Sequence, residues 1–403
     1  MSEEACEKLL SWARDRGIEV HGIEFRPIPG AGMGMIATKP LKRDERILYV
    51  PTSALRTIDT VRSRLKKSLP AGTKVHAMLA ADLALDGPRS KYAPWNAVLP
   101  SREDLLTSMP LAWQDTRLHA LLPQPAQRLL RAQQSKFARD WAAVQHALAS
   151  SSSSSLPRLN AKARTVARAD YLYAWLLANT RTFYHTTPRT ARLPRDDRMV
   201  LQPVADLFNH TGSAASDGDG GGCEVSFTPG GFSVRAVRAY APGEEVRICY
   251  GRHGNDFLLV EYGFVLPGAE NEWDEAGLDE AVVPELTDAQ RAVLEEKGFL
   301  GGYVLDGRTV CYRTLVAVRL MCAGSVEEWE RLVDEGEDGG EAMQREVDRV
   351  LRGILEKYRG RIDGTIREVE GSEAGEACQR AMLATRWRQI RRLVEQAIER
   401  LQF

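Results

Sequence analysis

The sequence predicts an α+β protein in which groups of short strands alternate with helical segments. Apolar residues recur at helical spacing over 3–17, over most of 53–180 and from about 284 to the end. Short alternating runs of polar and apolar residues, bounded by glycine and proline, occur in 18–51 and 198–265. With 403 residues, the chain is long enough for two or three domains and for a buried core without disulfide staples.

Composition and charge exclude several functional classes. Hydrophobic residues make up 43% and charged residues 27% of the chain, which is typical of a globular protein. The net charge of −1 argues against a protein whose whole body clamps nucleic acid, and we expect no nucleic-acid partner. The six cysteines include no Cys-x-x-Cys pair, which disfavours a zinc ribbon or a disulfide-rich scaffold. No apolar run approaches the roughly 18 residues of a membrane span, so we expect no membrane partner.

Residues 1–54 are predicted to form a helix followed by strands. The helical pattern covers 3–17, and strands are expected at Val20–Phe25, Met33–Ala37 and Arg46–Val50. The beginning of the chain is acidic, whereas a signal or transit peptide would be basic there. We therefore expect a cytoplasmic and/or nuclear protein.

Residues 55–170 are predicted to be a helical insert between two groups of strands. Val75–Leu85 and Leu129–Leu148 have the spacing of amphipathic helices. The serine run Ser150–Ser155 interrupts them and is too polar to pack, which predicts a disordered surface loop. A further helix is expected over Asp170–Phe183.

The strand pattern returns in 171–274, and helices are expected again in 275–403. Strands are predicted at Glu224–Phe227, Gly231–Val237 and Glu245–Tyr250, separated by Pro-Gly turns. The expected organisation therefore has four segments, namely 1–54, 55–170, 171–274 and 275–403.

Charge is distributed unevenly between the last segment and the rest of the chain. Residues 275–403 contain 26 acids and 19 bases, a net of −7. The first 274 residues contain 29 acids and 35 bases, a net of +6. This asymmetry fits solvated helix faces, and it also fits an acidic surface that receives a basic protein partner.

A glycine-rich turn, Pro29-Gly-Ala-Gly-Met-Gly34, is the first motif that could carry chemistry. It lacks the Gly-Lys-Ser/Thr ending of a P-loop. A strand pattern follows it, where a dinucleotide-binding fold would have a helix. Two interpretations are left: a turn whose backbone approaches a ligand closely, because glycine has no Cβ, or a plain hairpin turn.

The second motif, Asp206-Leu-Phe-Asn-His210, places a carboxylate, an amide and an imidazole within five residues. No second set of His, Asp or Glu stands at ligand spacing nearby, so we expect no metal. The third motif comprises Tyr250 at the end of a predicted strand, followed by Tyr262 and Phe264. These rings could surround a cation, or they could belong to the apolar core.

The order and spacing of these motifs resemble the SET-domain protein methyltransferases. The shared pattern is a Gly-x-Gly turn, then Asn-His, then Gly-Glu-Glu leading to Tyr-Gly, then Tyr-Gly-Phe. The helical insert and the helical tail resemble the Rubisco lysine methyltransferase-like class. The resemblance implies a split SET domain of short strands with a pseudoknot, followed by a C-terminal all-α substrate-binding domain.

The resemblance also implies S-adenosyl-L-methionine as cofactor. The residues implied to contact it are Gly32, Met33, Gly34, Arg181, Asn209, His210 and Tyr250. Arginine suits the cofactor carboxylate, and Asn209 has a structural role as well in the family's pseudoknot. Many relatives carry an acidic residue immediately before the Gly-x-Gly turn, whereas this chain has Ala31, so one contact to the cofactor amine is lost or replaced.

The same resemblance assigns the residues that handle the methyl acceptor. Tyr250 matches the catalytic tyrosine, and Asp206 is implied to support the neighbouring loop. The walls of a lysine channel are implied to be Phe183, Tyr262 and Phe264. Relatives that methylate histidine replace the Phe of Arg-x-Phe with asparagine and lack the Tyr of Tyr-Gly-Phe. This chain keeps both aromatic residues, which favours lysine.

The expected function is therefore a protein-lysine N-methyltransferase that acts on a non-histone protein, with a ribosomal protein or translation factor favoured. A free lysine has a pKa of about 10.4, and an apolar channel beside a cationic sulfonium lowers it, so that the amine loses its proton. Two alternatives stay open: a protein-histidine N-methyltransferase, and a catalytically silent SET module that binds proteins.

Overall fold

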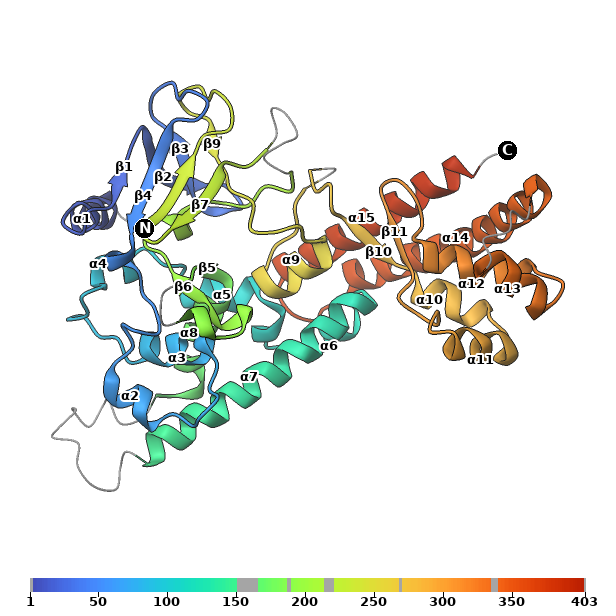
Figure 1. Cartoon of the computed structure of the whole chain (residues 1–403), viewed down its shortest axis with the longest axis horizontal. Helices are drawn as coiled ribbons and strands as arrows, with labels where there is room; N and C mark the ends of the chain where they lie inside the picture. The colour runs from blue at the N-terminus through green and yellow to red at the C-terminus, as the bar shows by residue number, and fades with distance from the viewer. Residues whose placement is uncertain are drawn as a thin grey trace. The chain divides into compact units, whose positions relative to one another are not determined.

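Strands and helices in the computed structural model of the chain fall into two units (Figure 1). The first comprises residues 1–106 and 131–252, and the second comprises 107–130 and 253–403. The structure describes residues 3–150, 166–186, 190–213, 221–267, 270–334 and 340–401. The predicted disordered loop beyond Ser150 lies outside the described residues.

The first unit contains three small antiparallel arrangements of strands. The strands are β1 (Glu19–Val20), β2 (Ile23–Ile28), β3 (Gly32–Ala37), β4 (Arg46–Pro51), β5 (Thr182–Tyr184), β6 (Met199–Leu201), β7 (Glu224–Thr228), β8 (Gly231–Arg235) and β9 (Glu245–Val246). One sheet has the order β1-β4-β8-β7, a second has the order β2-β3-β9, and β5 pairs with β6. In the β2–β3 hairpin, Ile28 pairs with Gly32, so the glycine-rich turn closes this hairpin.

Helices surround these strands in the first unit. They are α1 (Glu3–Arg14), α2 (Ser63–Ser68), α3 (Val75–Ala84), α4 (Ala93–Asn96) and α8 (Arg168–Arg181), with the 3₁₀ turns η1 (Thr52–Ala54), η4 (Thr190–Arg192), η5 (Arg195–Asp197) and η6 (Ala205–Leu207). Two further helices, α5 (Arg102–Ser108) and α7 (Gln124–Ser150), contribute residues to both units. Helices α3 and α8 pack against each other, and the buried Trp175 of α8 donates its indole N–H to Asp140 of α7 at 3.0 Å.

The bounds of several predicted elements differ from those of the structure, and three of these differences show where the prediction fails. The expected strand Val20–Phe25 is divided into β1 and β2, because Gly22 between them has a φ of +66°. The expected helix Asp170–Phe183 ends at Arg181, since the residues that follow pair with β6 as strand β5. The expected strand Glu245–Tyr250 ends at Val246, and its continuation forms isolated parallel bridges.

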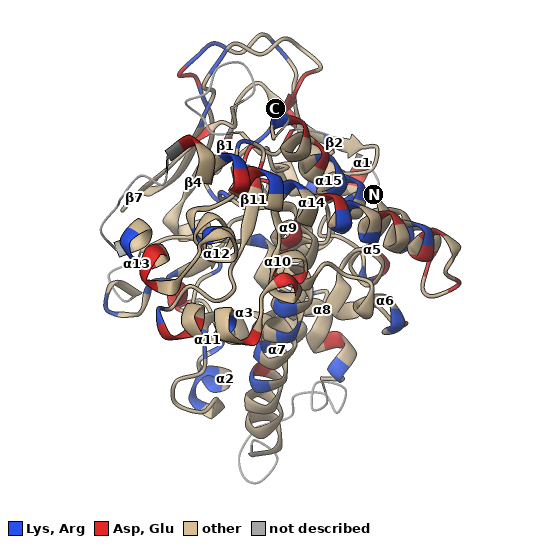
Figure 2. Cartoon of the chain, turned by 90° about the vertical axis from the view of Figure 1, so that its right-hand side faces the viewer, with Lys and Arg blue, Asp and Glu red and all other residues tan. Residues whose placement is uncertain are grey.

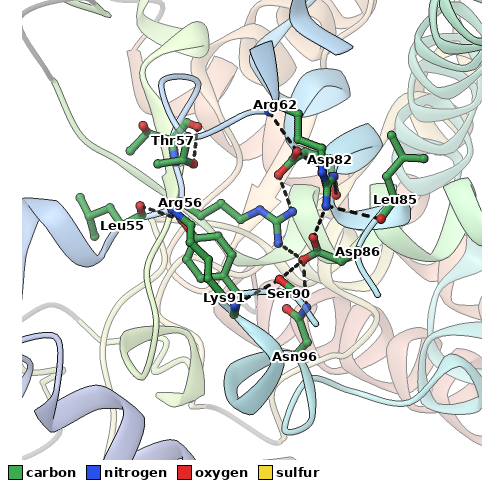
Figure 3. Close-up of polar contacts among 12 residues, drawn as sticks. Leu55, Arg56, Thr57, Arg62, Asp82, Leu85, Asp86, Ser90, Lys91 and Asn96 are labelled. Atoms are coloured by element: carbon green, nitrogen blue, oxygen red, sulfur yellow. Dashed lines mark hydrogen bonds and ion pairs between the residues drawn. The ribbon is translucent and has the colours of Figure 1, made fainter. Parts of the chain in front are cut away.

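A buried arginine ties the helical insert to the strands of the first unit (Figure 3). The Arg56 guanidinium is fully buried between two carboxylates, 2.5 Å from Asp82 and 2.7 Å from Asp86. Its backbone exchanges two hydrogen bonds with Leu201 of β6, at 3.0 and 2.9 Å. Arg62 adds a second cation to both carboxylates. The cluster is thus charge-balanced, which is the condition for burying ions without a large penalty.

The second unit is mainly helical. Its elements are η2 (Pro110–Ala112), α6 (Arg117–Ala120), α9 (Asn255–Tyr262), β10 (Glu275–Gly277), α10 (Asp279–Val282), η8 (Val283–Glu285), α11 (Asp288–Glu296), β11 (Val304–Asp306), α12 (Tyr312–Cys322), α13 (Val326–Asp334), α14 (Gly340–Gly371) and α15 (Ala377–Arg400). Helices α14 and α15 pack together over an apolar core that includes Trp329, Leu355 and Leu383. The β10–β11 pair is an addition that hydrophobic periodicity did not predict, because three-residue strands are too short to show a period of two.

Arg386 of α15 is the buried cation of the second unit. Its guanidinium lies 2.8 Å from Asp256 and 2.9 Å from Asp274, and it donates to the backbone carbonyl of Glu275 at 2.6 Å. These contacts join the last long helix to the beginning of α9 and to the segment before β10. Among the described residues, no helix is long and apolar enough to cross a membrane.

Candidate active site

The glycine-rich turn brings its backbone close to two polar side chains. Gly30 and Gly32 have φ values of +76° and +71°, the left-handed region that glycine adopts at little cost. At Gly34 a Cβ would lie 2.8 Å from Nδ2 of Asn209 and 2.7 Å from Oε1 of Glu245. Only glycine at position 34 therefore leaves room for these groups. At Gly32, by contrast, no atom lies within 4 Å of the position that a Cβ would take. The turn is open on one side and closely packed on the other.

Asn209 is held in place from its side chain and from its backbone. Its Nδ2 donates to Oε1 of Glu245 at 2.8 Å, and its carbonyl accepts from the backbone N–H of Ile248 at 3.0 Å. Ile248 forms parallel bridges with both His210 and Cys223. These bridges bring the Asn-His segment against the residues that follow β9 and lead to the predicted catalytic tyrosine.

His210 and Tyr250 contact each other through both backbone and ring. Nδ1 of His210 accepts a hydrogen bond from the backbone N–H of Tyr250 at 3.1 Å, so a neutral imidazole carries its proton on Nε2. The two rings stack with centroids 5.0 Å apart and planes inclined by 26°. The Tyr250 hydroxyl donates to the carbonyl of Phe208 at 2.5 Å. The orientation of the predicted catalytic hydroxyl is thereby fixed by the segment between Asp206 and His210.

Arg181, at the end of α8, reaches the same segment. Its Nη1 donates to the carbonyl oxygen of Asp206 at 2.6 Å and lies 3.4 Å from the carboxylate Oδ2. The Asp206 carboxylate is fully buried and also accepts from the indole N–H of Trp95. Burial raises the pKa of the Asp206 carboxyl, and the charge of Arg181 opposes this rise.

The three aromatic residues predicted to line a lysine channel are divided between the units. Phe183 in β5 pairs with Val200 and packs edge-to-face on Phe232, with centroids 5.4 Å apart. Tyr262 ends α9 in the second unit, and Phe264 follows it with ring centroids 6.3 Å apart. The structure thus groups Phe183 with Arg181 in one unit, and the position of Tyr262 and Phe264 in a channel stays a prediction.

Two residues of this arrangement were not singled out by the sequence. Glu245 belongs to the Gly-Glu-Glu motif, so the sequence marks this residue, but its contact with Asn209 was not predicted. Trp95 lies 111 residues before Asp206 in the helical insert, and no local pattern marks it. Within the described ranges, no group of three or more His, Cys, Asp or Glu side chains is placed to hold a metal ion.

Replacing Gly34 with alanine should weaken binding of S-adenosylmethionine by about tenfold or more. The added Cβ would displace the Asn209–Glu245 pair, and a displaced polar contact costs about 1–3 kcal/mol. Titration calorimetry with the cofactor measures the change. Gly30→Ala is the control in the same turn, because no atom lies within 4 Å of the new Cβ, and its φ of +76° adds a backbone strain that Gly34→Ala does not have. An equal loss of affinity in both variants would contradict the role of Gly34.

Comparison with known families identifies the class of the protein. Residues 32–251 match the SET domain family, and residues 275–400 match the family described as the ribosomal lysine N-methyltransferase 2 C-terminal domain. The SET match covers more than half of the chain, and the chain belongs to the SET-domain family.

Individual relatives agree with this assignment. The ribosomal lysine N-methyltransferase set11 of Schizosaccharomyces pombe is 26% identical over 368 residues, which cover 90% of this chain and 85% of the relative. The actin-histidine N-methyltransferase of Danio rerio is 25% identical over 65% of this chain, and the chain spans 42% of that relative. The solved structure of Rubisco LSMT bound to sinefungin and monomethyllysine superposes with a TM-score of 0.65 at 18% identity, covering 100% of this chain and 92% of the other.

These findings confirm three of the sequence predictions. The fold is the α+β SET fold with a C-terminal helical region, as in Rubisco LSMT. The family is that of the SET-domain methyltransferases, and the enzyme class is a protein-lysine N-methyltransferase. The predicted domain boundaries and the roles of the individual site residues stay predictions.

Proposed function

We propose that the protein transfers a methyl group from S-adenosylmethionine to a lysine of a ribosomal protein, in the cytoplasm and/or the nucleus. The observation that supports this substrate class is that both parts of the chain match ribosomal lysine methyltransferases. The S. pombe ribosomal lysine methyltransferase aligns with 90% of it, and the tail alone matches a domain family of ribosomal lysine methyltransferases.

The residues around Gly34 fit a ligand with the functional groups of S-adenosylmethionine. The Arg181 guanidinium suits a carboxylate, and the Asn209 amide and backbone groups of the turn suit an amine and a carboxylate. The His210 imidazole offers a polar edge and a ring face. When bound, the cofactor supplies an electrophilic methyl group on a sulfonium. The chain's own residues then have to hold the acceptor amine neutral and aligned.

Tyr250 is the residue that we expect to align the amine. Its hydroxyl proton is engaged by the carbonyl of Phe208 at 2.5 Å, so the oxygen presents its lone pairs to an incoming N–H. When the acceptor amine donates one N–H to this oxygen, the lone pair of the amine nitrogen points in a fixed direction. Positioning of this kind replaces a strong side-chain base, because the deprotonated amine is already a good nucleophile.

The acceptor amine reaches this position without its proton. A lysine in water has a pKa of about 10.4 and is charged at neutral pH. Apolar walls disfavour the charged form, and Phe183, packed on Phe232, supplies such a wall in the first unit. The proton leaves to solvent before the methyl group moves.

A transfer assay tests the proposal. The protein and its Tyr250→Phe variant are incubated with labelled S-adenosylmethionine and ribosomal subunits from cells that lack the enzyme. Label on a ribosomal protein that depends on Tyr250, mapped to a lysine by mass spectrometry, is the expected result. Label on a histidine would favour the second candidate, to which the relatedness to actin-histidine methyltransferases points. Cofactor binding without any transfer to ribosomal protein would contradict the substrate class.

We further propose that a basic protein substrate docks on helices α11 and α13. These two helices together carry seven acidic residues and two arginines (Figure 2). Both pack against α12, and Lys297 after α11 forms an ion pair with Glu330 of α13 at 2.8 Å. The first residue of α12, Tyr312, is 53% exposed. Two acidic helices and an exposed aromatic ring on the helix that they pack against suit a basic, partly apolar segment.

Charge reversal on these helices should raise KM for the protein substrate by about tenfold with kcat unchanged. The variant combines Glu295→Lys with Glu327→Lys, two exposed positions on α11 and α13. The effect should shrink as salt is added, because exposed charges are screened. Glu368→Lys, an exposed position on α14, is the matched control and should leave KM unchanged. Equal KM values for both variants would contradict the docking surface.

A further inference from the structure

The Asp206 carboxylate links two residues from distant parts of the first unit. Trp95 of α4 is 1% exposed and donates its indole N–H to Oδ1 and Oδ2 of Asp206 at 3.2 and 3.1 Å. On the other side, Arg181 Nη1 lies 2.6 Å from the Asp206 carbonyl and 3.4 Å from Oδ2. One buried residue thus receives a neutral donor from the helical insert and a charged donor from the end of α8.

Trp95 is itself held firmly. Tyr92 packs edge-on against its ring with centroids 5.8 Å apart, and the Arg56 guanidinium lies 4.9 Å from the centroid of Tyr92. Arg56 is fixed by its two buried carboxylates (Figure 3). The indole N–H is therefore directed at Asp206 by a stack of buried side chains, and it has little freedom to find another partner.

The backbone before Asp206 needs such support. Val204, two residues earlier, is fully buried and has a φ of +68°, a conformation that costs a β-branched residue about 1–3 kcal/mol. A strained turn keeps its shape only where its surroundings hold it. The Trp95 hydrogen bonds are contacts that hold this turn from the insert.

We propose that Trp95 is a positioning residue for Arg181. Its indole N–H holds the Asp206 carboxylate in place, so that Arg181 presents its remaining N–H groups to the carboxylate of the cofactor. This inference rests on the proposed function, in which Arg181 contacts that carboxylate. Trp95 would then affect cofactor binding without touching the cofactor.

The arrangement predicts a pH dependence of cofactor affinity. Burial raises the pKa of Asp206, while the charge of Arg181 and the hydrogen bond from Trp95 lower it. Arg181 is the charged group among the causes of that shift, so protonation of Asp206 removes the attraction between its carboxylate and this guanidinium, 3.4 Å away. The ionised form is needed, so affinity is present above the pKa of Asp206 and is lost as the pH falls through it. Removing the Trp95 N–H raises that pKa further and moves the loss to higher pH.

The test is Trp95→Phe, which removes the N–H and keeps an aromatic ring. Titration calorimetry with S-adenosylmethionine between about pH 4 and about pH 9 should give a Kd raised about tenfold, with the loss of affinity at the acid end moved to higher pH. Asp206→Asn should raise Kd to a similar extent and remove the loss of affinity at acid pH. The double variant should bind no more weakly than Asp206→Asn alone, because both changes act through one contact.

Trp175→Phe is the matched control, since it removes an indole–carboxylate hydrogen bond of the same kind, 3.0 Å to Asp140. It should lower Tm to a similar extent and leave the pH profile of Kd unchanged. A Trp95→Phe variant with wild-type Kd and pH profile overturns the inference. If that variant does not fold, a pH-independent Kd in Asp206→Asn supports the inference, and a wild-type profile there overturns it. No binding by the unaltered chain overturns the proposed function itself.

Discussion

Replacing Tyr250 with phenylalanine should lower kcat by at least about a hundredfold and leave the Kd for S-adenosylmethionine nearly unchanged. The hydroxyl is fixed by the Phe208 carbonyl at 2.5 Å, so it is already oriented before the amine arrives. Loss of one preorganised hydrogen-bonding group from a transition state typically costs about 10²–10³ in rate. The fold should persist, because the ring still stacks on His210 and the backbone N–H still bonds its Nδ1.

Single-turnover transfer to the ribosomal substrate measures this effect separately from product release. Tyr240→Phe is a matched control in the same unit, because it also removes a largely buried hydroxyl, which lies 3.5 Å from Sγ of Cys223. That variant should keep kcat within about a factor of two. Wild-type kcat in Tyr250→Phe would mean that other groups align the amine. A raised Kd with unchanged kcat would assign Tyr250 to cofactor binding alone.

The parts of the site that lie in short sequence motifs could be predicted from the sequence. Gly34, Asn209 and Tyr250 stand in motifs whose local chemistry is readable, and the structure brings all three into one unit. Their mutual contacts could not be predicted, because they depend on isolated bridges to Ile248 and not on a regular ladder. A period-two pattern extends a strand through such a region, and this is why the expected strand Glu245–Tyr250 was too long.

The buried charges were inaccessible to sequence reasoning for another reason. Arg56, Asp82 and Arg386 are buried, whereas residues of these types are nearly always exposed unless they are paired. Their partners lie far away in the sequence, 26 residues from Arg56 to Asp82 and 130 residues from Arg386 to Asp256. Hydrophobic periodicity identifies the apolar face of a helix, and it assigns such charged positions to the solvent side.

Arg386→Met should therefore lower the free energy of unfolding of the second unit by about 3–5 kcal/mol. The variant preserves most of the side-chain volume and leaves Asp256 and Asp274 buried without their cation. The charges of these two residues already add to burial in raising the pKa of Glu275. Burial alone lowers the pKa of the Arg386 guanidinium, and the two carboxylates more than reverse this, so the pKa is raised. The arginine thus stays charged, and its removal leaves two like charges together.

Urea unfolding followed by tryptophan fluorescence measures the loss. Arg388→Met is the matched control, since Arg388 lies on the same helix with its side chain 51% exposed and pairs with Glu370 on the surface. That change should cost no more than about 0.5–1 kcal/mol. Adding Asp256→Asn and Asp274→Asn to Arg386→Met should recover much of the stability. The loss of unfolding free energy comes from two buried carboxylates left without a cation, and not from the lost guanidinium volume. A similar small cost for Arg386→Met and Arg388→Met would show that the buried network does not hold α15 to the start of α9.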